Sequence, residues 1–175
     1  CGCFLHTFVH CNLEIFLNHL VTPLLAERLS LLHWMMSTAE SCTGGMIASQ
    51  CTDLPGSSTW FDRGFVTYSN HAKSDLLGVP SEMIAQHGAV SEAVAQAMAL
   101  GALYRSESVV SVAVTGIAGP SGGSQEKPVG TVWLAWCIGG RVYTELQTFS
   151  GNRDQIRVAT TDCALEGLLK RLPPL

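Results

Sequence analysis

Two candidate nucleophiles stand side by side in the stretch TAESCTGG, which covers residues 38–45. A short apolar run precedes it and an apolar helical pattern follows it, so Ser41 should lie in a turn between a strand and a helix. At a helix N-terminus the backbone N–H groups are unpaired and favour negative charge. A hydroxyl there can attack a carbonyl whose oxyanion faces those groups, and Gly44 and Gly45 let a ligand approach the backbone. The same geometry suits phosphate binding with Ser41 and Thr43 as mere caps and anion ligands, so both interpretations stand.

Cys42 is the alternative nucleophile, because a helix N-terminus lowers the pKa of a thiol. A cysteine enzyme usually needs a histidine base, however. His71 and His87 lie in segments that give no sign of facing residue 42. Cys42 is therefore predicted to be a small side chain that points into the core.

A serine nucleophile also needs a base, and the segment TYSNHAK offers two candidates. Tyr68 stands at a strand end, and Lys73 follows in the next turn or helix. A lysine accepts the serine proton only where burial or a nearby charge lowers its pKa, and a tyrosine can relay that proton or polarise the hydroxyl. The competing interpretation is a solvated surface lysine and a tyrosine at the edge of the core.

Further residues could bind a ligand. Thr115 ends a β-branched strand directly before a glycine, as a ligand-facing hydroxyl would, although ordinary turn chemistry explains it too. Arg153 and Arg157 lie one turn apart at the start of the last helix, where they could bind phosphate or form a solvated face. The loop over residues 116–128 offers backbone N–H groups to a phosphate or ribose but lacks the GxxxxGK[ST] order of a P-loop. Its candidate ligands are Gly119, Ser121, Gly122 and Gly123, with Ser124 and Lys127 as further donors.

The elements that must position these residues alternate between helices and strands. Apolar spacing and turn signals predict helices over residues 22–33, 46–51 and 91–104, a short helix around Lys73, and a last helix capped by Ser150 or Asn152. Thr22, Ser81 and Ser91 are the other predicted caps. Strands are predicted over residues 34–38, 61–68 and 109–115, and a hairpin joins 129–138 to 141–149. This order predicts an α/β fold whose mostly parallel sheet lies between helices, with one antiparallel strand from the hairpin.

Composition limits the classes of partner. The 175 residues are 47% apolar, enough for one packed domain, which we assign to residues 22–175. The net charge is -4 and no basic cluster tracks a phosphate backbone, which argues against direct binding of nucleic acid. The sequence has 7 cysteines, an odd number, and they are scattered along the chain without the regular pairing of a disulfide framework. Cys137 lies in a predicted buried strand. Reduced thiols and a cytoplasmic location are therefore expected.

Residues 1–21 read as an N-terminal extension that could pack on a neighbouring subunit in a homo-oligomer. Polar and charged residues interrupt its apolar pattern, so neither a signal peptide nor a membrane span is predicted. The same segment holds cysteine and histidine side chains, which are common metal ligands, but it has no CxxC pair. We therefore predict no metal site from them. They are Cys1, Cys3, His6, His10 and Cys11.

Several long motifs occur in an order that closely resembles the CinA C-terminal domain family, which includes the stand-alone nicotinamide mononucleotide amidohydrolases. The motifs are TAESCTGG, GSSTWFDRGFVTYSNHAK, LLGV, HGAVSE, VTGIAGPSGGSQEKPVGTV and SGNRDQIR, and the resemblance runs from about Leu24 to Leu172. The sequence lacks the large N-terminal domain of full-length relatives, so the resemblance is to the stand-alone amidase.

The resemblance implies a three-layer α/β/α fold and hydrolysis of nicotinamide mononucleotide to nicotinate mononucleotide and ammonia in pyridine nucleotide salvage. It implies Ser41 as nucleophile, Tyr68 and Lys73 as its base, and Thr115 as a further site residue, with no metal or other cofactor. The arginine of the SGxR segment matches Arg153, although Arg157 could serve instead. Two alternatives stand beside this one: a non-catalytic nucleotide-binding or competence-related interaction domain, and an enzyme for another amide or ester.

Overall fold

The computed structural model describes residues 20–174. Most of the predicted extension over residues 1–21 lies outside these residues, and so does the cysteine and histidine cluster within it. Residues 20–32 are helical, so the prediction that Thr22 caps this helix is wrong. Thr22 is instead buried inside the helix, where its hydroxyl accepts a hydrogen bond from Gln50 Nε2 at 3.1 Å.

A mixed five-stranded sheet, with the strand order β2-β1-β3-β4-β5, organises the described residues. Its strands are β1 (Met36–Glu40), β2 (Phe61–Val66), β3 (Val110–Gly116), β4 (Thr131–Ile138) and β5 (Arg141–Thr148). β1 pairs in parallel with β2 and β3, whereas β4 pairs antiparallel with β3 and β5. The reversed strand is thus β4 of the hairpin, which confirms the predicted sheet.

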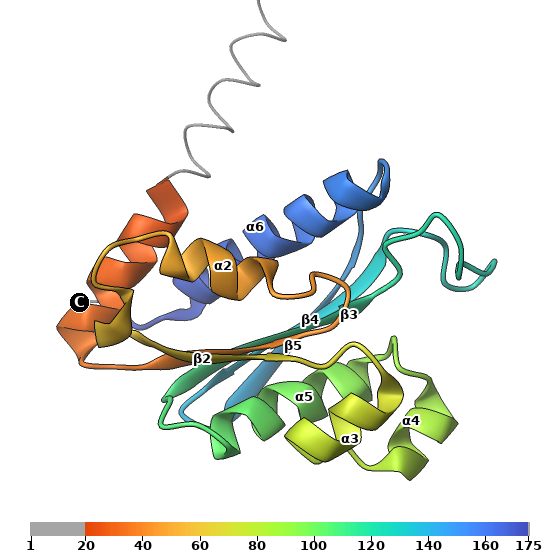
Figure 1. Ribbon diagram of the computed structural model, residues 1–175, viewed down its shortest axis with the longest axis horizontal. Helices are drawn as coiled ribbons and strands as arrows, with labels where there is room; N and C mark the ends of the chain where they lie inside the picture. Colours follow the sequence, from red (N-terminus) through yellow and green to blue (C-terminus); the bar gives the residue numbers. More distant parts are fainter. Residues whose placement is uncertain (1–19, 175) are drawn as a thin grey trace, which may run out of the picture.

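Helices cover both faces of this sheet, which makes three layers (Figure 1). One face carries helical residues 20–32 together with α2 (Met46–Thr52) and α6 (Arg153–Arg171). The other face carries α3 (Asn70–Leu77), α4 (Ser81–His87) and α5 (Glu92–Tyr104). A short 3-10 helix, η1 (Ser57–Thr59), leads into β2. The α/β/α fold that the resemblance implied is confirmed.

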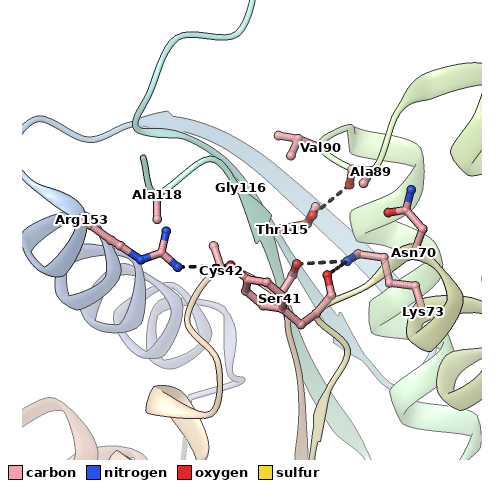
Figure 2. Close-up of a pocket in the computed structure, with 11 residues that line it drawn as sticks. Ser41, Cys42, Asn70, Lys73, Ala89, Val90, Thr115, Gly116, Ala118 and Arg153 are labelled. Atoms are coloured by element: carbon pink, nitrogen blue, oxygen red, sulfur yellow. Dashed lines mark hydrogen bonds between the residues drawn. The ribbon is translucent and has the colours of Figure 1, made fainter. Parts of the chain in front are cut away.

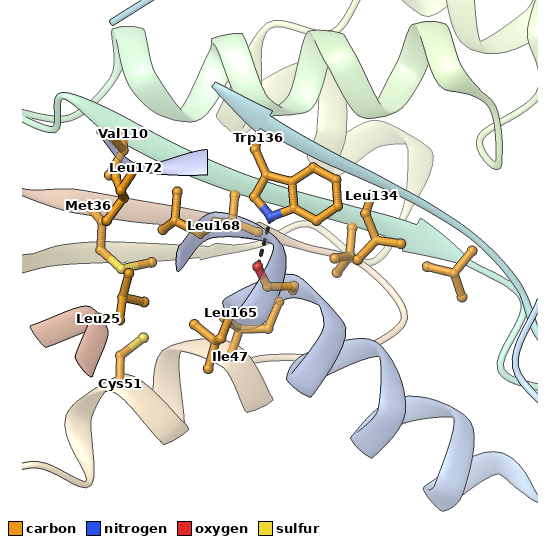
Figure 3. Packing of buried hydrophobic residues seen from close by; sticks show 14 of the residues in the cluster. Leu25, Met36, Ile47, Cys51, Val110, Leu134, Trp136, Leu165, Leu168 and Leu172 are labelled. Atoms are coloured by element: carbon orange, nitrogen blue, oxygen red, sulfur yellow. Dashed lines mark hydrogen bonds between the residues drawn. The ribbon is translucent and has the colours of Figure 1, made fainter. Parts of the chain in front are cut away.

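Alternate residues of the central strands supply two different cores. On the α6 side, Val112 of β3 and Trp136 of β4 pack with Leu165 and other aliphatic residues (Figure 3). Trp136 is fully buried, and its Nε1–H donates to the Ala164 carbonyl at 2.8 Å. On the α5 side the same strands present alanine, such as Ala113. Small side chains on that face let α5 lie close to the sheet.

Three helix caps and one strand end test the sequence patterns in detail. Ser91 and Asn152 each accept a hydrogen bond from the helix that follows, so these two caps are confirmed and Asn152 is chosen over Ser150. Ser81 is wrong as a cap, because Pro80 holds that position and no side chain caps α4. β1 runs to Glu40, two residues beyond its predicted end at residue 38. Glu40 is therefore part of the sheet, and Ser41 directly follows the strand.

Candidate active site

The carboxyl ends of β1 and β3 meet at a pocket of about 190 Å³ (Figure 2). After β1 the chain turns toward α2 on one face, and after β2 it passes through α3, α4 and α5 on the other. Such diverging connections leave a crevice beyond the strand ends, where ligands bind in open α/β sheets. The pocket is lined by Ser41, Cys42, Tyr68, Asn70, Lys73, Ala89, Val90, Thr115, Gly116, Ala118 and Arg153.

Ser41 and Lys73 are in direct contact, although they come from different elements. Lys73 Nζ lies 3.0 Å from Ser41 Oγ (Figure 2). It also lies 2.9 Å from the carbonyl oxygen of Thr67. Ser41 follows β1, and Lys73 lies in α3, where only 1% of its surface is exposed. Burial lowers the pKa of the Lys73 ammonium below its ordinary value. These are the conditions under which a lysine can act as the base for a serine.

Cys42 behaves as the sequence analysis predicted, as a core residue. It is 5% exposed and packs with the apolar cluster on the α2 and α6 side of the sheet. Burial raises the pKa of the Cys42 thiol to about 11. Because the thiolate is the nucleophilic form, Cys42 is unsuited to attack at neutral pH.

Glu40 is a residue that the sequence reasoning missed. Its carboxylate is fully buried and accepts hydrogen bonds from the backbone amides of Gly45, Ile47 and Ala48 at 2.9, 3.1 and 2.8 Å. The amides at the start of α2 are thus already bound, so they are not the oxyanion donors that the sequence analysis expected. The signal was an acidic residue before a turn that opens a helix, where a carboxylate is favourable.

Thr43 belongs to the same network and does not face the pocket. Its hydroxyl donates to Glu40 Oε2 at 2.7 Å and the residue is fully buried. Gly44 and Gly45 have φ values of 62° and 101°, in the left-handed region that favours glycine. They shape the turn that brings the α2 amides onto Glu40.

Tyr68 and Arg153 lie at the rim of the pocket. Tyr68 is 62% exposed, and its hydroxyl accepts a hydrogen bond from Arg153 Nη2 at 3.2 Å. The structure therefore places this hydroxyl beside Arg153, whereas the expected relay would need it between Ser41 and Lys73. Arg153 Nη1 also donates to the Gly119 carbonyl at 2.7 Å, so the loop after β3 is joined to the rim.

The remaining candidates divide between the pocket wall and other places. Thr115 lines the pocket, and its hydroxyl donates to the Ala89 carbonyl at 2.9 Å. Ser121, Gly122 and Gly123 lie in the exposed loop and are absent from the residues that line the described pocket. Arg157 contacts the turn that begins at Ser41, where it donates to the carbonyls of residues 42 and 43.

Residues 20–174 contain neither a cluster of metal-binding side chains nor a membrane-spanning helix. No group of three or more His, Cys, Asp or Glu side chains in this range could hold a metal ion. Among the same residues, no helix combines the length and the apolar character that crossing a membrane requires.

Residues 19–172 match the family model described as CinA C-terminal domain. The chain belongs to the CinA C-terminal domain family. Among its relatives, "Nicotinamide-nucleotide amidohydrolase PncC" of Escherichia coli (strain K12) is 54% identical over 134 residues, which cover 76% of this chain and 81% of that protein. The protein of the same name from Pseudomonas putida is 52% identical over 146 residues, 83% of this chain and 91% of its own length.

Members of known structure have the same fold. The crystal structure of the competence/damage inducible protein CihA from Agrobacterium tumefaciens superposes with a TM-score of 0.82 at 50% sequence identity. The match covers 86% of this chain and 94% of that one. The family resemblance drawn from the sequence motifs is confirmed.

Proposed function

We propose that this protein is an amidohydrolase that converts nicotinamide mononucleotide and water to nicotinate mononucleotide and ammonia, as a step in NAD salvage. The observation that carries the proposal is the 3.0 Å contact between Ser41 Oγ and the buried Lys73 Nζ at the end of β1. The names of its relatives in Escherichia coli and Pseudomonas putida support the substrate class.

The reaction begins when Lys73, as the free amine, accepts the Ser41 proton while Ser41 Oγ forms a bond to the carboxamide carbon. The tetrahedral intermediate collapses as its C–N bond breaks, and Lys73 returns the proton to the leaving nitrogen, which departs as ammonia. Water then attacks the acyl-enzyme ester with Lys73 as base. Nicotinate mononucleotide leaves and the Ser41 hydroxyl is restored.

The oxyanion donors of this mechanism must come from groups that Glu40 does not occupy. The amides of Gly45, Ile47 and Ala48 are bound to that carboxylate. We assign the role to the backbone N–H of Cys42, the residue after the nucleophile, which is the usual donor at strand-to-helix nucleophile turns. Thr115 holds the Ala89 carbonyl and thereby fixes the opposite wall of the pocket.

The pocket accepts only part of the substrate. Its volume of about 190 Å³ is below the ~300–1,000 Å³ typical of sites that enclose a whole ligand. A pyridine ring with its carboxamide can enter, while ribose and phosphate extend along the rim. Arg153 stands at that rim with its guanidinium near the Tyr68 hydroxyl and the Gly119 carbonyl, so we assign the 5′-phosphate to Arg153 and the amides of the loop after β3.

The function is tested by ammonia release from nicotinamide mononucleotide in the presence of EDTA. Nicotinamide riboside, which lacks the phosphate, and free nicotinamide serve as comparison substrates. We expect release from the mononucleotide, weaker activity on the riboside and the least on nicotinamide. No release from well-folded protein with any of the three would contradict the proposal.

The pH profile follows from the lowered pKa of Lys73. The free amine is the active form, so kcat/KM should rise with pH and level off above the Lys73 pKa, which lies below the ordinary lysine range. The same shift makes the contribution of Lys73 to the free energy of unfolding rise with pH between its lowered and its ordinary pKa, because the unfolded chain binds more protons there. A kcat/KM that falls as the Lys73 ammonium loses its proton would contradict the assignment of Lys73 as base.

We also propose that the protein works in the cytoplasm as a homo-oligomer. The buried free thiols of Cys51 and Cys137 suit a reducing compartment, which cell fractionation can check.

The proposed homo-oligomer is supported by an exposed apolar helix face. Leu20, Leu24 and Leu31 are each about half exposed and lie on one face of helical residues 20–32. Light scattering over a dilution series should therefore show an assembly, and a monomer at every concentration would contradict it.

A further inference from the structure

The sheet fixes the backbone of the nucleophile only up to Ser41. Ser41 N donates to the Val114 carbonyl at 3.1 Å, and the Glu40 carbonyl accepts from Thr67 N at 2.8 Å. Beyond this point the chain leaves the sheet in a turn over residues 41–44. The local bond that closes this turn runs from Gly44 N to the Ser41 carbonyl at 3.2 Å. The direction of the Ser41 side chain therefore depends on what else holds the turn.

The Glu40 carboxylate holds the turn and the α2 end beyond it through their donors. Thr43 Oγ1 donates to Oε2, and so do the amides of Gly45 and Ile47, while the amide of Ala48 donates to Oε1. Both oxygens thus accept from backbone N–H groups. A glutamine at this position would have to point its NH₂ group at one of those donors, so only a carboxylate satisfies all of them.

Arg157 holds the carbonyls of the same turn. Its Nε donates to the Cys42 carbonyl at 3.1 Å and its Nη2 donates to the Thr43 carbonyl at 2.8 Å. The nearest acid is Asp154, at 4.0 Å with an 88% exposed side chain, and an ion pair so exposed binds weakly. The guanidinium also lies against Gly44, where an added Cβ would stand 3.5 Å from Nη2. Arg157 therefore makes its strong contacts with the turn itself.

We propose that Glu40 and Arg157 form a turn clamp, a pair of positioning residues that keeps Ser41 Oγ in contact with Lys73 Nζ. Glu40 binds the Thr43 hydroxyl and the backbone amides that directly follow the turn. Arg157 binds the carbonyls within the turn, so a negative and a positive side chain hold it from its donor and its acceptor groups. The clamp rests on the proposed function. It also assigns Arg157 to the turn, which leaves the phosphate to Arg153. A displacement of the nucleophile by about 1 Å can cost on the order of 100-fold in rate.

Steady-state kinetics distinguish a positioning arginine from a phosphate-binding one. For Arg157→Met we expect kcat to fall roughly 10- to 100-fold with KM changed less than about twofold, equally for nicotinamide mononucleotide and nicotinamide riboside. Arg153→Met is the matched control, on the same helix, and should raise KM for the mononucleotide far more than for the riboside. Added guanidinium should partly restore kcat of Arg157→Met. A rise in KM confined to the mononucleotide in Arg157→Met would overturn the clamp.

A second readout needs no knowledge of the substrate. Phenylmethanesulfonyl fluoride forms a sulfonyl ester with an activated serine as fluoride leaves and the base takes the proton, and mass spectrometry measures its rate at Ser41. The rate should fall at least tenfold in Arg157→Met and Glu40→Gln, and Arg157→Lys should retain an intermediate rate. Urea denaturation checks that each variant is folded.

The two readouts separate the two proposals. If wild-type protein releases no ammonia but labels rapidly at Ser41, the proposed substrate fails, and the clamp is judged by labelling alone. If folded Arg157→Met labels as fast as the wild type, the clamp is wrong. If Arg157→Met does not fold, the same criterion applies to Arg157→Lys and Glu40→Gln.

Discussion

Replacing Lys73 with methionine should lower kcat on nicotinamide mononucleotide by about 10³-fold or more while the protein stays folded. General base catalysis contributes roughly 10²- to 10⁴-fold, and a nucleophile and its base act as a unit. Methionine fills a similar volume without the amine whose charged form burial disfavours. The loss should therefore appear in the rate of ammonia release and not in the cooperativity of unfolding.

Two further substitutions serve as controls for this prediction. Lys73→Arg keeps a charge that proteins do not remove at accessible pH, so it should be as inactive as Lys73→Met. Lys170→Met removes a surface lysine with a 72% exposed side chain and should leave kcat unchanged. Wild-type kcat in folded Lys73→Met would mean that another group takes the serine proton.

Replacing Trp136 with alanine should destabilise the fold by about 3–5 kcal/mol, the usual cost of removing a buried aromatic side chain. Trp136 is fully buried between the sheet and α6, and Cζ of the Arg171 guanidinium lies 3.9 Å from the centroid of its ring. A Cβ added at Gly167 would collide with the indole, which shows how closely α6 packs there. Because domains of this size are stable by about 5–15 kcal/mol, the loss is a large share of the total.

Urea unfolding measures this effect through the midpoint at a constant m-value. Tyr104→Ala is the control, since Tyr104 lies at the end of α5 with 76% of its surface exposed, and it should change stability by less than about 0.5 kcal/mol. Trp136→Phe should fall between the two because it keeps a ring and loses the bond to Ala164. Equal midpoints for Trp136→Ala and wild type would contradict the packing described for α6.

Local patterns predicted the fold well because each of them involves residues that lie close together in the sequence. The β-branched run before Thr115 became β3, and Asn152 with Gln155 forms the capping box that starts α6. The Gly139-Gly140 turn joins β4 to β5. Thr22 failed as a cap because a threonine is also acceptable inside a helix where its hydroxyl finds a partner, here Gln50.

The site was harder to predict, because its contacts join distant residues. Nothing in the spacing says that Lys73 reaches a serine 32 positions earlier, since this depends on the order of β1 and β3 in the sheet and on the depth of α3. The predicted strand ends at residue 38, before Glu40. Only the extension of β1 to Glu40 places its carboxylate beside the backbone amides of α2. Arg157 reaches back 115 positions to residue 42 through the packing of α6, which no local pattern contains.

The most direct test of the central claim compares ammonia release from nicotinamide mononucleotide by wild type, Ser41→Ala and Cys42→Ala, each with EDTA present. The structure gives Ser41 the contact with Lys73 and gives Cys42 a buried thiol whose pKa is raised to about 11. We therefore predict that Ser41→Ala is inactive and that Cys42→Ala keeps most of the wild-type kcat. Activity that survives in Ser41→Ala and disappears in a folded Cys42→Ala would contradict the account and would show that Cys42 is the nucleophile.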